Sequence, residues 1–138
     1  MIRKAIRQKL TERGIKQADF CKVIGVAASN FNAFLNGTRS LSYPKLVKAL
    51  EELGLSVGLK AAGRAILPPS ELSEIFKSHF AVSGMKVKEV AEKTDTDNTC
   101  LTAFFNGYRK LPIKSLEKVM VLFNLDVVEY INPKKKTA

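Results

Sequence analysis

The 138-residue sequence contains no tryptophan, a single histidine and only two cysteines. His79 has no CxxC or HExxH pattern near it, so no ligand set for zinc is present. Two cysteines in an intracellular-looking chain are more often free thiols than a disulfide, and we expect this of Cys21 and Cys100. The sequence therefore predicts no metal and no cofactor.

Long apolar runs and catalytic constellations are missing as well. No stretch approaches the roughly 18 to 20 apolar residues that cross a bilayer. The start of the chain, Met1-Ile2-Arg3-Lys4, leads into a mixed segment without the apolar core of a signal peptide. No nucleophile, carboxylate pair or phosphate loop has a credible spacing. We expect a cytoplasmic protein that is not an enzyme and has no membrane partner.

Acidic residues are few compared with basic ones. The chain has 23 Lys and Arg against 13 Asp and Glu, a net charge of +10. Such an excess predicts a polyanionic partner, which can be nucleic acid, an anionic membrane surface or an acidic protein. The charge alone does not choose among them.

An internal repeat organises the chain. A shift of 70 residues aligns positions 2–57, the first copy, with positions 72–127, the second copy, without a gap. Twelve of these 56 pairs are identical, whereas a random offset gives roughly three or four. Most other pairs keep their apolar character, as Ile6 and Phe76 do. We therefore expect two similar units, each with its own core.

The apolar spacing within each copy is helical and is broken at glycines. It predicts an all-α fold with helices over 2–13, 17–24, 28–35 and 43–53, and over 71–82, 87–94, 98–105 and 113–123. Ser42 and Pro44 fit the start of the fourth helix, and Ser70 is the expected N-cap of the fifth.

The helices define the expected domains. We assign residues 1–57 to a first domain, 58–69 to a linker, 70–131 to a second domain and 132–138 to a basic disordered tail. Both copies end in an alternating stretch, 55–60 and 125–131. These stretches predict short strands that pair with each other or with a second chain, or frayed extensions of the preceding helices.

Residues 17–37 have the properties that two crossing helices require. Cys21 is small enough for a close crossing, and Gly25 accepts a positive φ at the turn. Aromatic residues such as Phe31 and Phe34 are expected in the core, because their helical spacing favours packing over base stacking. The outward positions of the second helix are small or polar, so this helix can enter a major groove. They are Ala28, Ser29, Asn32 and Ala33.

This segment resembles the phage-repressor or Cro-like (Xre-type) helix-turn-helix family. The resemblance rests on Gln17, the turn glycine and Phe31-x-x-Phe34-Leu35-Asn36-Gly37, and it extends over residues 2–57 and again over 72–127. It implies tandem lambda-repressor-like domains of four to five helices. It also implies that Gln17, Asn36 and Arg39 contact phosphates, while Ala28, Ser29, Asn32 and Ala33 form the base-reading set. Asparagine suits a bidentate contact with adenine.

The second copy departs from this pattern. Val87 replaces the opening glutamine, and Asp95 and Asp97 stand at the turn and at the start of the next helix. These carboxylates repel a DNA backbone. Residues 1–69 carry 12 basic and 4 acidic side chains (+8), and residues 70–138 carry 11 and 9 (+2). We expect the first copy to be the principal DNA reader. The corresponding candidates in the second copy are Asn98, Thr99, Thr102, Asn106 and Arg109.

Two classes of function remain. The first is a transcription regulator, expected to be a repressor, that binds double-stranded DNA sequence-specifically. The alternative is a protein-interaction module, such as an antitoxin or anti-regulator, with a homodimer or another protein partner engaged through the second copy. DNA affinity in residues 1–60 but not in 70–131 separates the two. The alternative to DNA contact is an ordinary solvated surface for Ser29, Asn32, Arg39 and Lys45.

Overall fold

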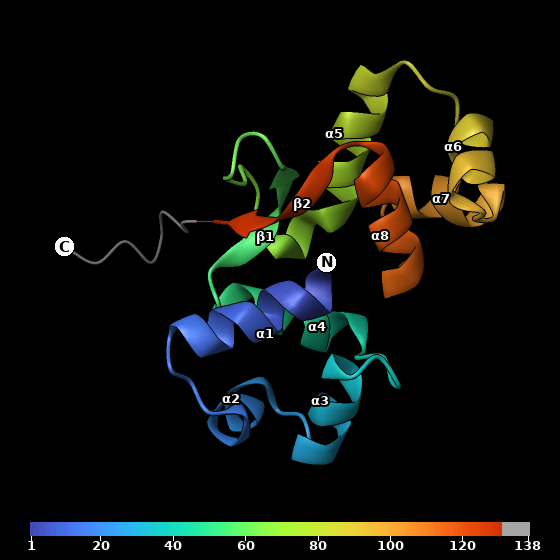
Figure 1. Cartoon of the computed structure of the whole chain (residues 1–138). Helices are drawn as coiled ribbons and strands as arrows, with labels where there is room; N and C mark the ends of the chain where they lie inside the picture. Colours follow the sequence, from blue (N-terminus) through green and yellow to red (C-terminus); the bar gives the residue numbers. More distant parts are fainter. Residues whose placement is uncertain (131–138) are drawn as a thin grey trace.

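The computed structural model describes residues 1–130. In this range the chain forms helices and two short strands (Figure 1). The first half contains α1 (Ile2–Glu12), α2 (Gln17–Ile24), α3 (Ala28–Leu35), α4 (Tyr43–Glu52) and β1 (Leu55–Leu59). A 3₁₀ helix, η1 (Pro69–Glu71), precedes the second half, which contains α5 (Leu72–Ser83), α6 (Val87–Thr94), α7 (Asn98–Phe105), α8 (Ile113–Leu122) and β2 (Leu125–Glu129). The tail expected over 132–138, and Ile131, lie outside the described residues.

The predicted helices are confirmed, each with its ends within one residue of the expected position. Within residues 1–130 the fold is accordingly helical, with one small sheet. The predicted N-cap at Ser70 is wrong, because Ser70 lies inside η1 and Glu71 is the residue that precedes α5. Pro69 is the first residue of η1, and the fixed φ of proline favours such a helical start.

One continuous apolar core extends through both halves instead of a separate core in each, and in each half it contains a phenylalanine of the third helix. Phe34 and Phe104, which occupy equivalent positions, are both 0% exposed. Phe31 lies 5.6 Å from Phe20, and Phe76 lies 5.3 Å from Phe104, measured between ring centroids. The aromatic residues of the two recognition-helix segments are therefore core residues, as expected, and cannot act as a base-stacking platform.

The two halves are joined through one antiparallel pair of strands. Leu55 pairs with Glu129, Val57 with Val127 and Leu59 with Leu125. Of the alternatives for these stretches, pairing within the chain is confirmed. Residue 127 is the repeat equivalent of residue 57, so β1 pairs with the equivalent strand of the other copy. The pairing is symmetric about a twofold axis that passes between Val57 and Val127.

Backbone hydrogen bonds at the strand ends follow the same symmetry. The Lys60 N–H donates to the Asn124 carbonyl at 3.0 Å, and the Tyr130 N–H donates to the Gly54 carbonyl at 2.8 Å. The two bonds are equivalent, because Tyr130 is the repeat counterpart of Lys60 and Gly54 is the counterpart of Asn124. The two copies are thus related as the subunits of a twofold dimer are.

The segment after β1 packs onto the sheet. The Ala65 N–H donates to the Glu129 carbonyl at 2.9 Å, and the Ser56 hydroxyl donates to the Leu67 carbonyl at 2.8 Å. Ala65 is 5% exposed. The expected linker therefore contributes its own contacts to the junction between the halves.

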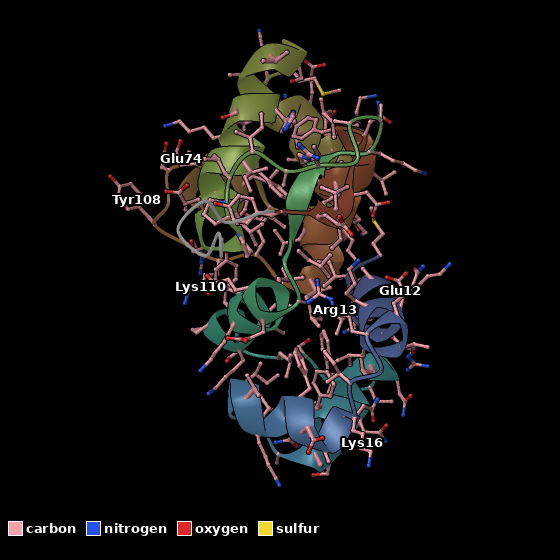
Figure 2. All side chains as sticks on the ribbon, turned by 90° about the vertical axis from the view of Figure 1, so that its left-hand side faces the viewer. Glu12, Arg13, Lys16, Glu74, Tyr108 and Lys110 are labelled. Atoms are coloured by element: carbon pink, nitrogen blue, oxygen red, sulfur yellow. The ribbon has the colours of Figure 1, made fainter. Side chains whose placement is uncertain are left out.

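The two halves extend from the sheet as two arms (Figure 1). The pairs α2/α3 and α6/α7 lie at the far ends of these arms, well separated from each other. Closer to the sheet, the Met1 ammonium lies 3.1 Å from a Glu117 carboxylate oxygen. Lys110 lies between the arms, with its Nζ 5.2 Å from the centre of the Tyr43 ring (Figure 2). These contacts hold the arms in one relative orientation.

Candidate nucleic-acid interface

The first arm contains a helix-turn-helix built from α2 and α3. Gly25 ends α2 with φ 72° and ψ 42°, a left-handed conformation that favours glycine. The Val26 N–H donates to the Cys21 carbonyl at 3.0 Å and closes the turn. Cys21 is 4% exposed at the crossing of the helices. The turn therefore forms as the sequence predicts.

The structure brings the expected base-reading residues together on one face of α3. Ala28, Ser29 and Asn32 are exposed, and Ala33 is half-buried beside them. Their neighbours Phe31 and Phe34 point into the core. Successive turns of α3 therefore present a small, polar surface to solvent, with no bulky side chain on it to obstruct entry into a groove.

The expected phosphate-contacting residues Gln17, Asn36 and Arg39 are all exposed. The Arg39 guanidinium donates a hydrogen bond to the side-chain oxygen of Asn30. The oxygen of the Asn36 amide accepts a bond from Arg7 Nη2 at 3.4 Å. Both side chains are thus oriented by neighbours while their remaining donors face solvent.

Lys45 is a basic residue near the turn, considered beside Arg39 in the sequence but not assigned a phosphate contact. It is half-buried, and a Cβ added to Gly25 would lie 2.9 Å from its Nζ. Lys45 and Arg39 line a cavity of about 390 Å³ together with Gly25 and Asn30. The one indication of a special role for Lys45 in the sequence is that its counterpart in the second copy is the uncharged Ser115.

Two arginines of α1 bind the C-terminal end of α3. Arg3 Nε donates to the Phe34 carbonyl at 2.7 Å, and Arg7 Nη2 donates to the Leu35 carbonyl at 3.1 Å. The last carbonyls of a helix lack partners within the helix and carry partial negative charge, so cations are favourable there. Ser73 and Lys77 stand at these positions in the second copy. The arginines position α3 in the first arm.

The second helix-turn-helix has the same backbone but a different surface. Asp95 occupies the left-handed turn position, with φ 50° and ψ 48°, as predicted. The candidates Asn98, Thr99, Thr102, Asn106 and Arg109 are all exposed. Arg109 Nη1 lies 3.3 Å from Cys100 Sγ, which repeats the pairing of Arg39 with Asn30. Tyr108, which is 86% exposed, adds an aromatic ring to this surface (Figure 2).

Asp97 occupies the N-terminus of α7 with its own carboxylate. One oxygen accepts hydrogen bonds from the Thr99 N–H at 2.7 Å and the Cys100 N–H at 3.1 Å. These donors are the groups that a helix N-terminus offers to a phosphate. In α3 the equivalent residue is Ala27, which has no side-chain acceptor. At the N-terminus of α7 two N–H groups are therefore already occupied by a carboxylate, whereas at the N-terminus of α3 no side chain caps the N–H groups.

The Asp97 cap also has a measurable effect on stability. We expect Asp97→Ala to lower the free energy of unfolding by about 0.5–2 kcal/mol, because two N–H groups lose their acceptor. Asp97→Asn keeps an acceptor oxygen and is the control, with a loss of only a few tenths of a kcal/mol expected. Urea unfolding followed by circular dichroism measures both. Equal losses in the two variants would show that the cap is not what the aspartate contributes.

The residues that the structure describes contain neither a candidate metal centre nor a membrane-spanning helix. Within residues 1–130 no group of three or more His, Cys, Asp and Glu side chains is placed to hold a metal ion. Cys21 and Cys100 are both free thiols. No helix in this range has both the length and the apolar character to span a bilayer.

Comparison with protein families matches residues 6–60 to a helix-turn-helix model. Comparison with curated proteins and with solved structures yields no match. The matched range runs from α1 to the end of β1 and contains all the expected DNA-contacting residues of the first copy. It does not include the second copy.

Proposed function

Since residues 6–60 match the DNA-binding helix-turn-helix family, we propose that this chain is a cytoplasmic transcription regulator that represses by binding double-stranded DNA sequence-specifically. In this proposal residues 1–57 and 70–131 act as separate DNA-facing domains, and α3 is the principal reader. The observation that carries the proposal is the exposed polar face of α3. The cations of Arg39 and Lys45 lie beside Gly25 and Asn30, close to the turn that precedes this helix.

The proposed contacts follow from side-chain chemistry. Asn32 donates to and accepts from an adenine edge, and Ser29 bonds to a neighbouring base. Ala28 and Ala33 permit close approach and can contact thymine methyl groups. Gln17, Asn36 and Arg39 bind phosphates and set the register of the helix in the groove.

The twofold relation of the copies supports a particular kind of DNA site. Two readers related by a twofold axis match two half-sites in inverted orientation, about one helical turn or roughly 34 Å apart. A tandem repeat in the sequence favours no such orientation. The Asp97 carboxylate at α7 weakens phosphate binding on the second half-site. We therefore propose an inverted, unequal pair of half-sites as the operator.

Selection from a random duplex pool with the full chain tests this proposal. We expect one well-defined half-site, followed one turn away by a weaker, inverted one. Enrichment of direct repeats would contradict the twofold arrangement. Absence of binding even at about 50 mM salt would overturn the DNA-binding function itself.

The difference between the arms is tested by exchanging a residue between them. We expect Lys45→Ser to weaken binding to all duplexes alike and to reduce the slope of log affinity against log salt by about 1, because one phosphate contact is lost. Ser115→Lys should strengthen binding to duplexes that contain both half-sites. Lys60→Ser, next to the sheet, is the control and should leave the slope unchanged. Fluorescence anisotropy over a salt series measures all three.

The acidic surface of the second arm favours a second candidate function, pairing with a protein. Glu92, Asp95 and Asp97 are exposed beside α7. An antitoxin or anti-regulator with this surface binds a basic partner or another copy through the second domain. If Ser115→Lys leaves DNA affinity unchanged while Lys45→Ser lowers it, this function for the second arm is favoured over DNA reading.

A further inference from the structure

Two grooves flank the sheet at equivalent places in the two copies. One lies between α1 and β2, and the other lies between α5 and β1. Six residues that line the α5 groove have their repeat equivalents in the lining of the α1 groove: Val57, Gly58, Leu59, Ile75, Ser78 and His79. The twofold axis of the strands therefore relates the grooves too, and differences between them come from side chains.

An ion pair closes the α1 groove. Lys9 Nζ lies 2.9 Å from Glu129 Oε1 and 3.3 Å from Glu12 Oε2. The hydrogen bond from Lys9 lowers the pKa of the Glu129 carboxyl below its usual value, so the pair is charged at neutral pH. The Lys9 side chain is only 14% exposed. The remaining cavity measures about 250 Å³.

The α5 groove lacks this closure. His79 replaces Lys9 and Leu59 replaces Glu129, so no opposite charges meet across it. Burial lowers the pKa of His79, which leaves its imidazole uncharged at neutral pH. Val82, the equivalent of Glu12, is 88% exposed one helical turn beyond His79. The open cavity measures about 730 Å³.

The lining of this cavity is apolar, with one cationic side chain. Its wall is formed by Val57, Leu59, Ala65, Leu67 and Ile75. Ile66, also in the lining, is 92% exposed. Glu129 reaches the rim but is already bound to Lys9. Arg64 also lines the cavity, and among residues 1–130 no carboxylate lies within ion-pair distance of it. Its charge adds to the larger effect of Lys9 in lowering the pKa of the Glu129 carboxyl.

We propose that the α5 groove is a binding site for a small molecule with an apolar body and one anionic head group, such as a medium-chain carboxylate. Its volume lies within the roughly 300–1,000 Å³ of small-molecule pockets, and an apolar wall with few polar groups is typical of them. Arg64 supplies the complementary charge for the head group. A second copy of the chain is a poorer occupant, because both copies carry +10.

Fluorescence titration of the full chain tests this site. The probe is 8-anilinonaphthalene-1-sulfonate, whose rings and sulfonate match the proposed chemistry, and the competitors are decanoate and decanol. We expect one probe molecule per chain and displacement by decanoate at about tenfold lower concentration than by decanol, which corresponds to about 1.4 kcal/mol. Equal potency of decanoate and decanol would overturn the proposal.

Two variants identify the groove. Leu59→Glu combined with His79→Lys recreates the ion pair of the α1 groove and should abolish probe binding. Arg64→Gln should retain probe binding at reduced affinity and remove the preference for decanoate. Val121→Ser, which alters a 65% exposed apolar residue on α8, is the control and should behave as the parent chain does.

Other outcomes decide against the site. Unchanged probe binding in a folded L59E/H79K variant would overturn it. If that variant does not fold, an unchanged preference for decanoate in Arg64→Gln does so instead. Sedimentation that reveals a dimer which Leu59→Glu dissociates would assign the groove to a second copy. DNA binding measured on the same samples is independent of this site, so failure here leaves the proposed function intact.

Discussion

Replacement of Asn32 by alanine is expected to weaken binding to the preferred duplex by about 1–3 kcal/mol, or roughly 5- to 160-fold. Asn32 lies on the exposed face of α3, where its amide can reach a base edge. Removal of a bidentate contact also removes the penalty for a wrong base at that position. We therefore expect specificity to relax there, which competition with single-base variants of the selected duplex will measure.

The loss in Asn32→Ala is compared with the losses in two other variants, Arg39→Ala and Thr102→Ala. Arg39→Ala should weaken selected and random duplexes alike, because a phosphate contact carries no sequence information. Thr102 is the counterpart of Asn32 in α7. Its replacement should cost less, since we propose that the second arm is the weaker reader. Equal losses on selected and random DNA for both Asn32→Ala and Arg39→Ala would contradict the assigned roles.

Phe34→Ala is expected to lower the free energy of unfolding by about 3–5 kcal/mol. The ring is 0% exposed, its centroid lies 6.1 Å from that of Phe31, and Arg3 lies 5.1 Å from it. Truncation leaves a cavity between α1 and α3 that rigid helices cannot fill. Because small proteins are stable by only about 5–15 kcal/mol, this loss threatens the whole first arm. Urea unfolding at equilibrium measures it.

Two matched variants accompany Phe34→Ala. Phe104→Ala removes the equivalent ring of the second copy, also 0% exposed, and should cost a similar amount. Val23→Ala alters a residue of α2 that is 51% exposed and should change stability by no more than about 0.5 kcal/mol. A cost below about 1 kcal/mol for Phe34→Ala would be incompatible with its placement in the core.

Much of the local structure could be predicted from residue spacing. Helix positions follow from apolar residues at helical intervals and from the glycines between them. Asp95 could be predicted at a left-handed turn because aspartate tolerates this conformation. The error at Ser70 has a local cause too. Capping preference alone favours Ser70 as the N-cap. Pro69 starts a 3₁₀ turn that includes Ser70, so the N-cap of α5 is Glu71.

Contacts between distant segments could not be predicted. Lys45 is close to Gly25 because α4 packs against α2. Arg3 and Arg7 bind the end of α3 because α1 packs against α3. Spacing along one helix shows which face is polar. It does not show which group on another helix that face meets.

The sequence by itself determined that the chain contains two similar halves, where their helices lie and that the first half carries the excess positive charge. The helix positions depend on side chains within a turn or two of each other, and the repeat and the charge can be counted from the sequence directly. Only the tertiary structure decided how the halves are related. The alternating stretches 55–60 and 125–131 were equally compatible with intramolecular strands, strands paired to another chain or frayed helices.

Hydrogen bonding between backbones far apart in the sequence selects one of these arrangements, because unpaired N–H and C=O groups at the junction are costly. The chosen register, centred on Val57 and Val127, turns a tandem repeat into a twofold pair. The same strand pairing places His79 beside Leu59 in one groove and Lys9 beside Glu129 in the other. The first groove is therefore open, and the second is closed by an ion pair.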